Sequence, residues 1–453
     1  MKHGPLFLAV YGVSLISFLT SSPLQASVET ADHPNVIIIL TDDLGYGDLS
    51  SYGHPTIRTP RLDRMAEEGL RLTSFYAAAS ACTPSRAGLL TGRYPIRAGL
   101  PYVLGPEAND GLSPKEITLG SALKSLGYHT AHIGKWHLGH HENAFLPTAH
   151  GFDEYFGLLY SNDMIPPWVK TDRPLTYFRN TDAIEGPVDQ RQLTVRYTRE
   201  AVDFIRRHHN APFFLYLAHS MPHVPIYASE EHRGRSRGGR YGDVVESLDW
   251  STGRILDTLQ ELGIDDRTLV IFTSDNGPWN NMPERMFSQE LLPGHERIRP
   301  WHAGSTGLLR GGKGTSYEGG FRVPAIIRWP NHVPPDRVSA EILTAMDLFS
   351  TIIDLAGGVV PSDRSIDGNN ATPFLTGVSD FSPTRSFFYC QGEVVEAVRE
   401  GSWKLRITSD DGVQLFQVEE DPGERFNRAV EEPARVAALR ARLEAFRDIV
   451  QQW

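Results

Sequence analysis

The stretch NVIIILT, residues Asn35–Thr41, is an unbroken run of mostly apolar, β-branched residues. A strand with one wet face alternates apolar and polar residues, whereas an unbroken apolar run is typical of a strand buried on both faces of a parallel sheet. The run leads into two acids, Asp42 and Asp43. We therefore predict a buried parallel strand whose carboxyl end presents two carboxylates.

Further strand candidates alternate with helical patterns along the chain. Thr59 before Pro60 is typical of a helix N-terminus, and apolar residues up to Leu70 give that helix one apolar face. A second helical pattern runs from Val244 to Leu262 and is closed by Gly263. The other strand candidates are Pro212–Leu217, Leu269–Thr273 and Val323–Trp329. This alternation predicts an α/β fold with a large, mostly parallel sheet flanked by helices.

The last part of the chain has a different pattern. Three short strand candidates, Ser386–Tyr389, Glu396–Glu400 and Trp403–Ile407, include a hairpin at residues 400–402, and a charged amphipathic helix follows over Ala434–Val450. These features predict a smaller C-terminal antiparallel sheet plus helix. We place a large domain at residues 27–380 and a small α+β subdomain at residues 381–453.

The N-terminus has the pattern of a secretory signal peptide over residues 1–26. Lys2 precedes an apolar stretch from Leu6 to Leu19, and Ala26 is a small residue at the expected cleavage position. The alternative is an uncleaved membrane anchor, which the short apolar stretch disfavours. The pattern predicts export to the periplasm or medium, or to the lysosome if the host is eukaryotic, without a stable membrane span.

The net charge limits the classes of partner that the protein can have. The 453 residues carry 44 Lys and Arg against 55 Asp and Glu, a formal net charge of -11. This balance argues against nucleic acid as the main partner, although a small anionic substrate can still bind local cations.

The only two cysteines are Cys82 and Cys390. They could form a disulfide, but a chain of this length does not need one, so Cys82 is available for another role.

A second acidic segment follows the strand candidate Leu269–Thr273. It reads Ser274-Asp275-Asn276-Gly277. Ligand sites in open α/β sheets lie at the carboxyl ends of strands, so this segment and the Asp42-Asp43 pair should lie close together. Either pair alone could be a solvated turn or a helix cap. Together they offer three carboxylates and one amide oxygen, hard ligands that suit Ca²⁺ or Mg²⁺.

Between these two segments lies Cys82-Thr83-Pro84-Ser85-Arg86. Pro84 can open a helix, which would place residue 82 at the helix N-terminus, where free N–H groups favour an anion. On position alone, the simpler interpretation is a buried cysteine beside a capped helix. The five-residue run, however, resembles the signature of the sulfatase family, in which the cysteine is oxidised after synthesis to formylglycine (3-oxoalanine).

Other segments resemble motifs of the same family in the same order. They are Gly134–Gly139, Ser161, Pro222–Pro225 with His223, Gly311–Gly314 and Tyr317–Gly320. A lone histidine or lysine is more often structural than catalytic, so the joint occurrence carries the resemblance. It covers about residues 34–430. It implies an alkaline-phosphatase-like fold in which residues 27–380 form the catalytic domain.

The resemblance also implies a role for each residue. The implied catalytic residues are Cys82, Arg86, Lys135, His137, His223 and Lys313, and the implied substrate ligands are Ser161, Lys135, His223 and Lys313. The implied metal ligands are Asp42, Asp43, Cys82, Asp275 and Asn276. The implied metal is Ca²⁺, with Mg²⁺ as the alternative. The implied partners are a sulfated carbohydrate or aryl sulfate and the enzyme that generates formylglycine.

Within the family, the chain resembles the branch of arylsulfatase A and N-acetylgalactosamine-6-sulfatase. Arg240–Asp243, Pro225–Ser229, Pro361–Arg364 and Asp421–Arg425 carry this likeness. It implies a 6-sulfated galactose or N-acetylgalactosamine as substrate. The chain departs from that branch because it lacks a cysteine-rich C-terminal extension and has a long loop, Pro278–Ala303, whose tryptophans could stack on a sugar.

Two other functions stay open at this stage. A phosphonate monoester or phosphodiester hydrolase of the same superfamily could share the Cys82 motif. A non-catalytic carbohydrate-binding protein with an unmodified Cys82 is the remote alternative. The sugar, the choice between exo and endo action and the possibility of a homodimer are left open as well.

Overall fold

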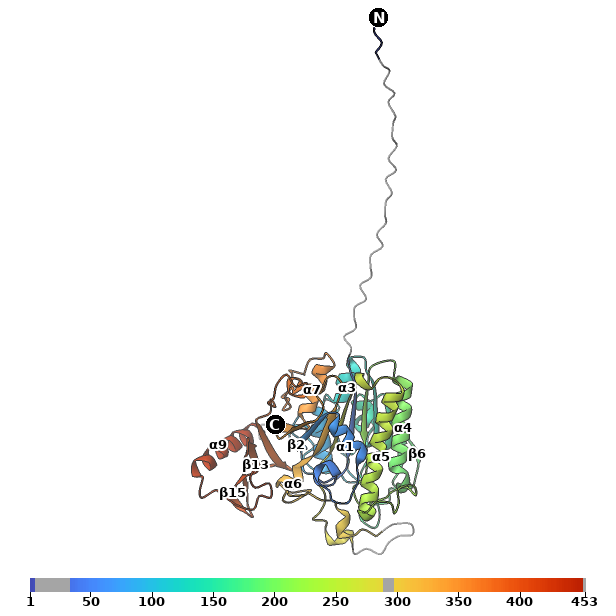
Figure 1. The fold of residues 1–453 in the computed structure, drawn as a ribbon. Helices are drawn as coiled ribbons and strands as arrows, with labels where there is room; N and C mark the ends of the chain where they lie inside the picture. The colour runs from blue at the N-terminus through green and yellow to red at the C-terminus, as the bar shows by residue number, and fades with distance from the viewer. Residues whose placement is uncertain (5–32, 288–296, 451–453) are drawn as a thin grey trace. The chain divides into compact units, whose positions relative to one another are not determined.

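The computed structural model describes residues 1–4, 33–287 and 297–450, and residues 33–453 belong to one compact unit (Figure 1). The predicted signal peptide lies, apart from its first four residues, outside the described residues. Within the described part of the chain, no helix is both long and apolar enough to cross a membrane.

A mixed sheet of eleven strands forms the centre of this unit. Ten strands lie in the order β10 (Arg337–Ser339), β2 (Leu70–Tyr76), β9 (Arg322–Arg328), β8 (Thr268–Ser274), β1 (Asn35–Thr41), β7 (Phe213–Ala218), β3 (His129–Lys135), β4 (Glu154–Leu158), β5 (Tyr177–Arg179) and β6 (Asp182–Glu185), and β11 (Leu343–Thr344) pairs with β2. Strand β1 is parallel to both β7 and β8, and all of its residues are buried.

Helices pack on this sheet in two groups (Figure 1). The first group is α1 (Pro60–Glu67), α4 (Leu193–His208) and α5 (Gly239–Glu261), and the second is α2 (Cys82–Thr91), α3 (Leu119–Ser125) and α7 (Asp347–Leu355). Two single-turn helices, α6 (Glu318–Phe321) and α8 (Thr372–Leu375), lie in connections. The sheet is therefore covered by helices, as its buried apolar strands require.

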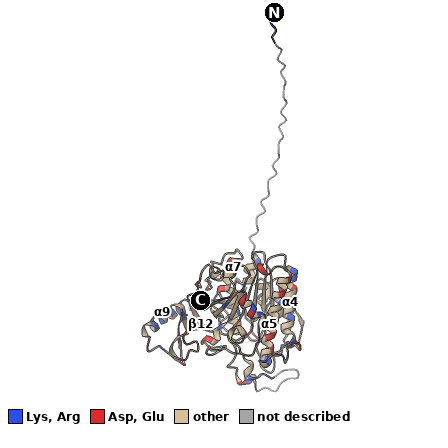
Figure 2. Ribbon diagram, viewed as in Figure 1, with Lys and Arg blue, Asp and Glu red and all other residues tan. Residues whose placement is uncertain are grey.

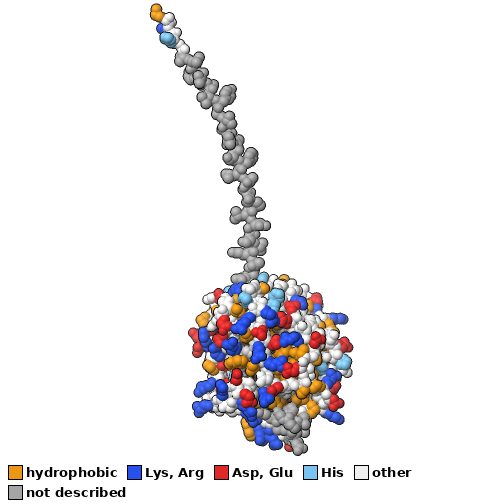
Figure 3. Space-filling view, turned by 90° about the vertical axis from the view of Figure 1, so that its right-hand side faces the viewer, with side chains coloured by type: hydrophobic (Ala, Val, Ile, Leu, Met, Phe, Trp, Pro, Cys, Tyr) orange, Lys and Arg blue, Asp and Glu red, His pale blue; other side chains and the backbone are white. Residues whose placement is uncertain are grey.

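Charges of both signs are mixed on the surface. Figure 2 shows acidic and basic residues along α4, α5 and α9 (Pro433–Val450). Arg206 of α4, for example, lies 3.1 Å from Glu261 of α5. On the face in Figure 3, acidic, basic and hydrophobic side chains are interspersed, and neither sign of charge dominates that face.

The second sheet is antiparallel, in the order β12 (Ser386–Gln391), β13 (Val394–Glu400), β14 (Trp403–Thr408) and β15 (Gly412–Gln417). Helix α9 covers it: Leu439 and Leu443 of the helix share one apolar cluster with Phe387, Leu405 and Leu415 of the strands. The cluster also includes Tyr76 of β2 and Phe321 of α6, so the two sheets share buried apolar contacts.

A buried ionic network also joins the second sheet to the first. The Glu318 carboxylate accepts hydrogen bonds from Tyr76 of β2 at 2.5 Å, from Tyr389 of β12 at 2.5 Å and from Lys404 of β14 at 3.0 Å. Lys404 also lies 2.7 Å from Glu424. Burial alone would raise the pKa of Glu318, but Lys404 and Arg399 hold it well below its ordinary value. Glu318 is therefore ionised, and Lys404 is the cation that two buried acids share.

The strands named from sequence are largely confirmed. Strand β1 has the predicted bounds, and the strands predicted at 212–217, 269–273 and 323–329 are β7, β8 and β9, each within one residue at either end. However, β9 runs antiparallel to both β2 and β8, so the sheet is mixed. The three predicted C-terminal strands and the last helix are present, and a fourth strand, β15, was missed. The domain boundary near residue 380 stays a prediction.

The end of the first predicted helix was wrong. Helix α1 ends at Glu67, and Leu70 begins strand β2. A side chain on Gly69 would lie 2.2 Å from the carbonyl oxygen of Ile327, so only glycine lets the chain pass this close to β9. Leu70 then pairs with Ile327. The apolar residue that seemed to extend the helix face is therefore buried in the sheet.

We expect Lys404→Ala to destabilise the protein by about 3–5 kcal/mol, because it leaves the buried carboxylates of Glu318 and Glu424 without their shared cation. Urea unfolding followed by circular dichroism would measure the change. Lys115→Ala, at an exposed lysine, is the control and should change the free energy of unfolding by less than about 0.5 kcal/mol. Equal stabilities of the two variants would contradict this role of Lys404.

Candidate active site

Residues from five neighbouring strands meet at one edge of the large sheet. Strands β8, β1, β7, β3 and β4 run parallel, so their carboxyl ends lie on the same side. The predicted site residues at or after these ends, all buried, are Asp275 and Asn276 (β8), Asp42 and Asp43 (β1), His223 (β7), Lys135 and His137 (β3) and Ser161 (β4). The fold thus brings together residues up to 234 positions apart (Asp42 to Asn276).

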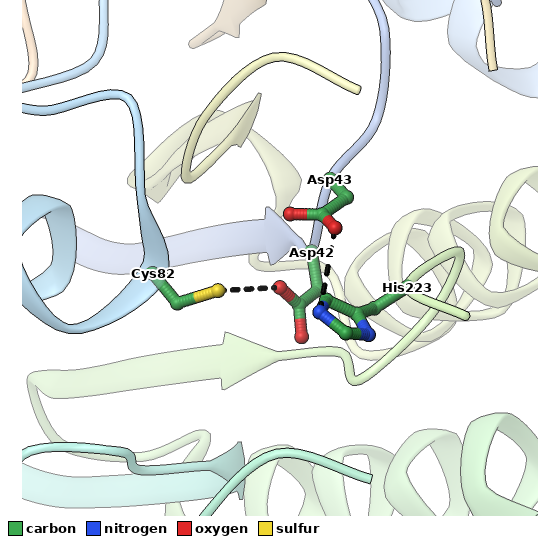
Figure 4. Close-up of side chains that lie close together, drawn as sticks. All are labelled: Asp42, Asp43, Cys82 and His223. Atoms are coloured by element: carbon green, nitrogen blue, oxygen red, sulfur yellow. Dashed lines mark hydrogen bonds and ion pairs between the residues drawn. The ribbon is translucent and has the colours of Figure 1, made fainter. Parts of the chain in front are cut away.

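The turn after β1 directs both of its acids into the site. Asp43 has a φ of 63°, in the left-handed region, which aspartate tolerates better than most residues. Its backbone N–H donates to Asp275 Oδ1 at 3.1 Å, and the N–H of Asp42 donates to the carbonyl of Met221 at 3.2 Å. Figure 4 shows the side chains of Asp42 and Asp43 on the side where Cys82 and His223 lie.

Cys82 is the first residue of α2, as predicted, and its side chain faces the two acids (Figure 4). Its Sγ lies 3.5 Å from Asp42 Oδ1 and 3.2 Å from Lys313 Nζ. Burial raises the pKa of the Cys82 thiol to about 12, although Lys135 and Lys313 oppose this shift. The thiol is therefore neutral at pH 7 and a poor nucleophile in its unmodified form.

Each of the three buried carboxylates at the site has a cationic partner. Lys135 Nζ lies 2.6 Å from Asp42 Oδ2, and Lys313 Nζ lies 2.7 and 2.8 Å from the two oxygens of Asp43. Arg86 donates through Nε and Nη2 to Asp275 Oδ2, at 2.9 and 2.7 Å. Burial would raise the pKa of Asp42, but Lys135 and its other cationic neighbours bring it far below its ordinary value. The site thus keeps charged groups in a water-poor environment by pairing them.

The two histidines present different ring nitrogens. His223 Nδ1 lies 2.5 Å from its neighbour's carbonyl, Val224 O, and its Nε2 lies 3.4 Å from Asp43 Oδ2. His137 Nε2 donates to Leu104 O at 2.8 Å, which leaves Nδ1 as the basic nitrogen. Burial, and next Lys135, lower the pKa of His137 well below its ordinary value. The His137 ring is therefore neutral at pH 7, and its Nδ1 carries no proton.

The carboxylate and amide oxygens at the site fit a hard divalent cation. Ligand atoms of Asp42, Asp43, Cys82 and His223 all lie within 4.8 Å of one another. Asn276 donates through Nδ2 to Asp43 Oδ1 at 2.7 Å, whereas its buried Oδ1 has no partner among the described residues. A buried oxygen without a donor calls for an explanation, and a bound cation provides one. Carboxylate and amide oxygens favour Ca²⁺ or Mg²⁺ over zinc.

Contacts around the site include several that the sequence patterns do not indicate. Gln391 of β12 donates to Ser80 Oγ at 2.8 Å, and the carbonyl of Ser80 accepts from the Gly314 N–H at 2.9 Å. The second sheet therefore holds both the segment before Cys82 and the segment of Lys313. Leu104, whose carbonyl orients His137, was also missed, because a backbone acceptor has no side-chain signal.

Three tryptophans, two of them from the predicted loop Pro278–Ala303, have different environments. Trp279 lies over Lys313, with Nζ 5.1 Å from the ring centroid, and its ring centroid is 5.8 Å from that of His223. Trp168 is only 4 % exposed and packs in the core, so it presents no open face to a sugar. Trp301 is 73 % exposed. Residues 288–296 of the predicted substrate loop lie outside the described residues.

Two family models match the chain. The model described as Sulfatase matches residues 34–359, and the model described as N-sulphoglucosamine sulphohydrolase, C-terminal, matches residues 312–448. Arylsulfatase A of Bos taurus is 38 % identical, with 89 % of this chain and 85 % of the relative covered. N-acetylgalactosamine-6-sulfatase of Canis lupus familiaris is 41 % identical, with 88 % and 76 % covered.

Solved structures show the same likeness. The PsFucS1 sulfatase from Pseudoalteromonas sp. has a TM-score of 0.80 at 29 % identity and covers 91 % of this chain and 90 % of its own. The phosphonate monoester hydrolase of Agrobacterium radiobacter has a TM-score of 0.62 at 20 % identity, with 92 % and 96 % covered. At that identity, the second likeness shows a shared fold and no more.

We expect Ca²⁺ to stabilise the protein against unfolding by about 2.7 kcal/mol at a concentration of 100 times Kd. Asp43→Asn should lose most of this gain, because it removes one of the clustered carboxylates. Thermal unfolding with and without Ca²⁺ would measure the effect. Asp266→Asn, at an exposed aspartate, should keep the full gain. If Asp43→Asn were stabilised as much as the wild type, the cation site would have to lie elsewhere.

Proposed function

The chain belongs to the sulfatase family and is a hydrolase of sulfate esters, and from this premise we propose that its nucleophile is a formylglycine made from Cys82 and that its cofactor is Ca²⁺. The observation that carries the proposal is the buried position of Cys82 between Asp42 and Lys313. The unmodified thiol there is a poor nucleophile, whereas a hydrated aldehyde at residue 82 would supply a hydroxyl beside an acid cluster and two lysines.

The cationic groups bind the ester. Lys135 and Lys313 flank residue 82, and Ser161 Oγ lies 3.1 Å from Lys135 Nζ, so these groups are placed to hold sulfate oxygens. Fixed positive groups in a buried site stabilise charge that develops in the transition state. When bound, Ca²⁺ would withdraw electron density from the sulfate ester and lower the pKa of a hydroxyl on residue 82. Asp42, Asp43, Asp275 and Asn276 would hold the ion.

The histidines would move the protons. One hydroxyl of hydrated residue 82, ionised by loss of its proton to solvent, attacks sulfur, the bond from sulfur to the ester oxygen breaks, and protonated His223 donates a proton to the departing alcohol. His137, whose Nδ1 is the basic nitrogen, then takes the proton of the second hydroxyl. The carbon–oxygen bond to the sulfate breaks and the aldehyde forms again, ready to add water. Arg86, held by Asp275 and the carbonyl of Lys135, would orient residue 82.

Maturation must precede folding. Cys82 is 2 % exposed, and every residue of α2 is buried, so an enzyme cannot reach the thiol in the folded protein. We therefore propose that a formylglycine-generating enzyme acts on the unfolded chain, before or during export. The predicted signal peptide would direct the chain into the export path, to the periplasm or the medium.

The proposed substrates are saccharides with a 6-sulfated galactose or N-acetylgalactosamine. Support comes from the relatives, which include N-acetylgalactosamine-6-sulfatases, and from Trp279 beside Lys313 and His223. An aromatic face at this point could stack on the leaving sugar while the sulfate lies against the lysines.

We expect the matured protein to contain an aldehyde at residue 82, detectable as a lower peptide mass and by reaction with a hydrazide. Cys82→Ala should lose nearly all turnover, because no side chain remains to attack sulfur. Cys82→Ser should stall as a sulfated serine, since a single hydroxyl cannot expel the sulfate by forming an aldehyde. Full activity from protein with an unmodified thiol would refute the proposed nucleophile.

We expect kcat/KM for 6-sulfated galactosides to exceed that for 4-sulfated galactosides by up to about 10⁴-fold, because misplaced hydroxyls leave buried polar groups unpaired. An aryl sulfate and an aryl phosphonate, measured in parallel, are the controls. A preference for the 4-sulfate would overturn the proposed sugar and leave the sulfatase assignment intact. A preference for the phosphonate would favour the alternative hydrolase.

A further inference from the structure

A pocket of about 470 Å³ lies outside the ester site just described. Its walls come from residues 165–166, 171–175 and 187–191, together with Tyr227. None of the proposed catalytic or metal-binding residues lines it. Its volume falls in the range of small-ligand clefts.

The topology places this pocket at the same edge of the sheet as the ester site. Residues 165–175 connect the carboxyl end of β4 to β5, which runs antiparallel to β4. Residues 187–191 follow β6, which runs antiparallel to β5 and so ends at that edge as well. Tyr227 lies four residues after His223, in the connection that follows β7.

One pair of hydrogen-bonded side chains links the lining of the pocket to a neighbour of the ester site. Gln190, which lines the pocket, donates to the carbonyl of Asn162 at 3.0 Å and accepts from Asn162 Nδ2 at 3.0 Å. Asn162 also donates to Pro225 O at 3.1 Å. Its neighbour Ser161 contacts Lys135. A short series of contacts, from Gln190 to Asn162 and from Ser161 to Lys135, therefore relates the pocket lining to the sulfate-binding groups.

The loop after β8 reaches both the ester site and the segment that lines the pocket. Trp279 of that loop covers Lys313, and Arg285 Nη1 donates to Trp168 O at 2.8 Å. Trp168 closely follows Pro166, which lines the pocket. This loop therefore contacts both Lys313 of the ester site and the segment that includes Pro166 of the pocket lining.

The charges of the pocket lining balance, two aspartates against two arginines, so the pocket has no excess positive charge to attract an anion. Arg173 Nε lies 3.1 Å from Glu107 Oε2, and Arg191 Nη2 lies 2.9 Å from Asp189 Oδ2, so both arginines of the lining are already paired with acids. Asp172 adds a further carboxylate. The apolar part of the lining includes prolines and leucine, which suit the C–H face of a pyranose.

We propose that this pocket binds a neutral sugar unit next to the sulfated sugar, so that the protein prefers an oligosaccharide whose second unit carries neither sulfate nor carboxylate. The inference rests on the proposed function, since it needs a sulfated saccharide at the lysines. The lining has no excess of cations to attract an anionic second unit, and the exposed carboxylate of Asp172 can accept hydrogen bonds from sugar hydroxyls.

The test compares three substrates of the matured, calcium-loaded protein. They are 6-sulfated galactose, 6-sulfated galactose linked to N-acetylglucosamine, and the same disaccharide with a sulfate on the second unit. We expect kcat/KM to rise about tenfold from the monosaccharide to the neutral disaccharide, which corresponds to about 1.4 kcal/mol. The doubly sulfated disaccharide should lose this gain.

Two variants link the preference to the pocket. Val188→Trp fills the pocket and should remove the gain without changing kcat/KM for the monosaccharide. Asp172→Arg, at an exposed position, should shift the preference toward the doubly sulfated disaccharide. Asp380→Arg makes the same change of charge at an exposed residue outside the lining and should change none of the three values.

Equal kcat/KM for the monosaccharide and the neutral disaccharide would overturn the inference. So would a Val188→Trp variant that slows all three substrates alike. A wild type that hydrolyses no sulfate ester would instead refute the proposed function. In that event, ligand-observed NMR with unsulfated galactosyl-N-acetylglucosamine decides: binding that Val188→Trp abolishes supports the pocket, and a lack of binding to the wild type overturns it.

Discussion

Three carboxylates buried at the ends of β1 and β8 impose the main constraint on this protein. A charge removed from water must find a partner, and the chain supplies one to each acid: Lys135 from β3, Arg86 from α2 and Lys313 from the connection before α6. Each partner comes from a different segment. The pairing therefore joins the central strands, the buried helix α2 and the later connections in one site. The two lysines that would bind sulfate also offset the energetic cost of burying two of these carboxylates.

The second sheet belongs to this arrangement. Through Gln391 it holds Ser80, and through Lys404 it holds Glu318, so the segments of Cys82 and Lys313 are both fixed from outside the large sheet. Glu318 is only five residues from Lys313. A lysine proposed to act in catalysis from an irregular connection needs such support, because no ladder of backbone hydrogen bonds sets its position.

The sequence predicts the parts of the fold that local patterns determine. The run NVIIILT gives β1 and its two acids, and the parallel arrangement places Asp275 and Asn276 beside them. Strand β3 was missed because HTAHIGK has polar residues that only tertiary packing buries. The lysines and histidines of the site were found by resemblance, since a lone lysine or histidine has no periodic signal. The hydrogen bonds between Asn162 and Gln190 join residues 28 positions apart, and no local sequence pattern predicts such a contact.

Because the first turn of α2 is buried, the proposed modification of residue 82 also has a consequence for the composition of a purified sample. Under the proposed maturation, molecules that escaped conversion at Cys82 would fold around the same apolar core, because the thiol would occupy the place of the aldehyde in the buried helix α2. Size, secondary structure and melting behaviour would then describe the whole population, whereas turnover would count only the converted fraction. Specific activity would therefore report how completely residue 82 was converted before the chain folded, and two preparations of identical purity could differ in rate without any difference in shape.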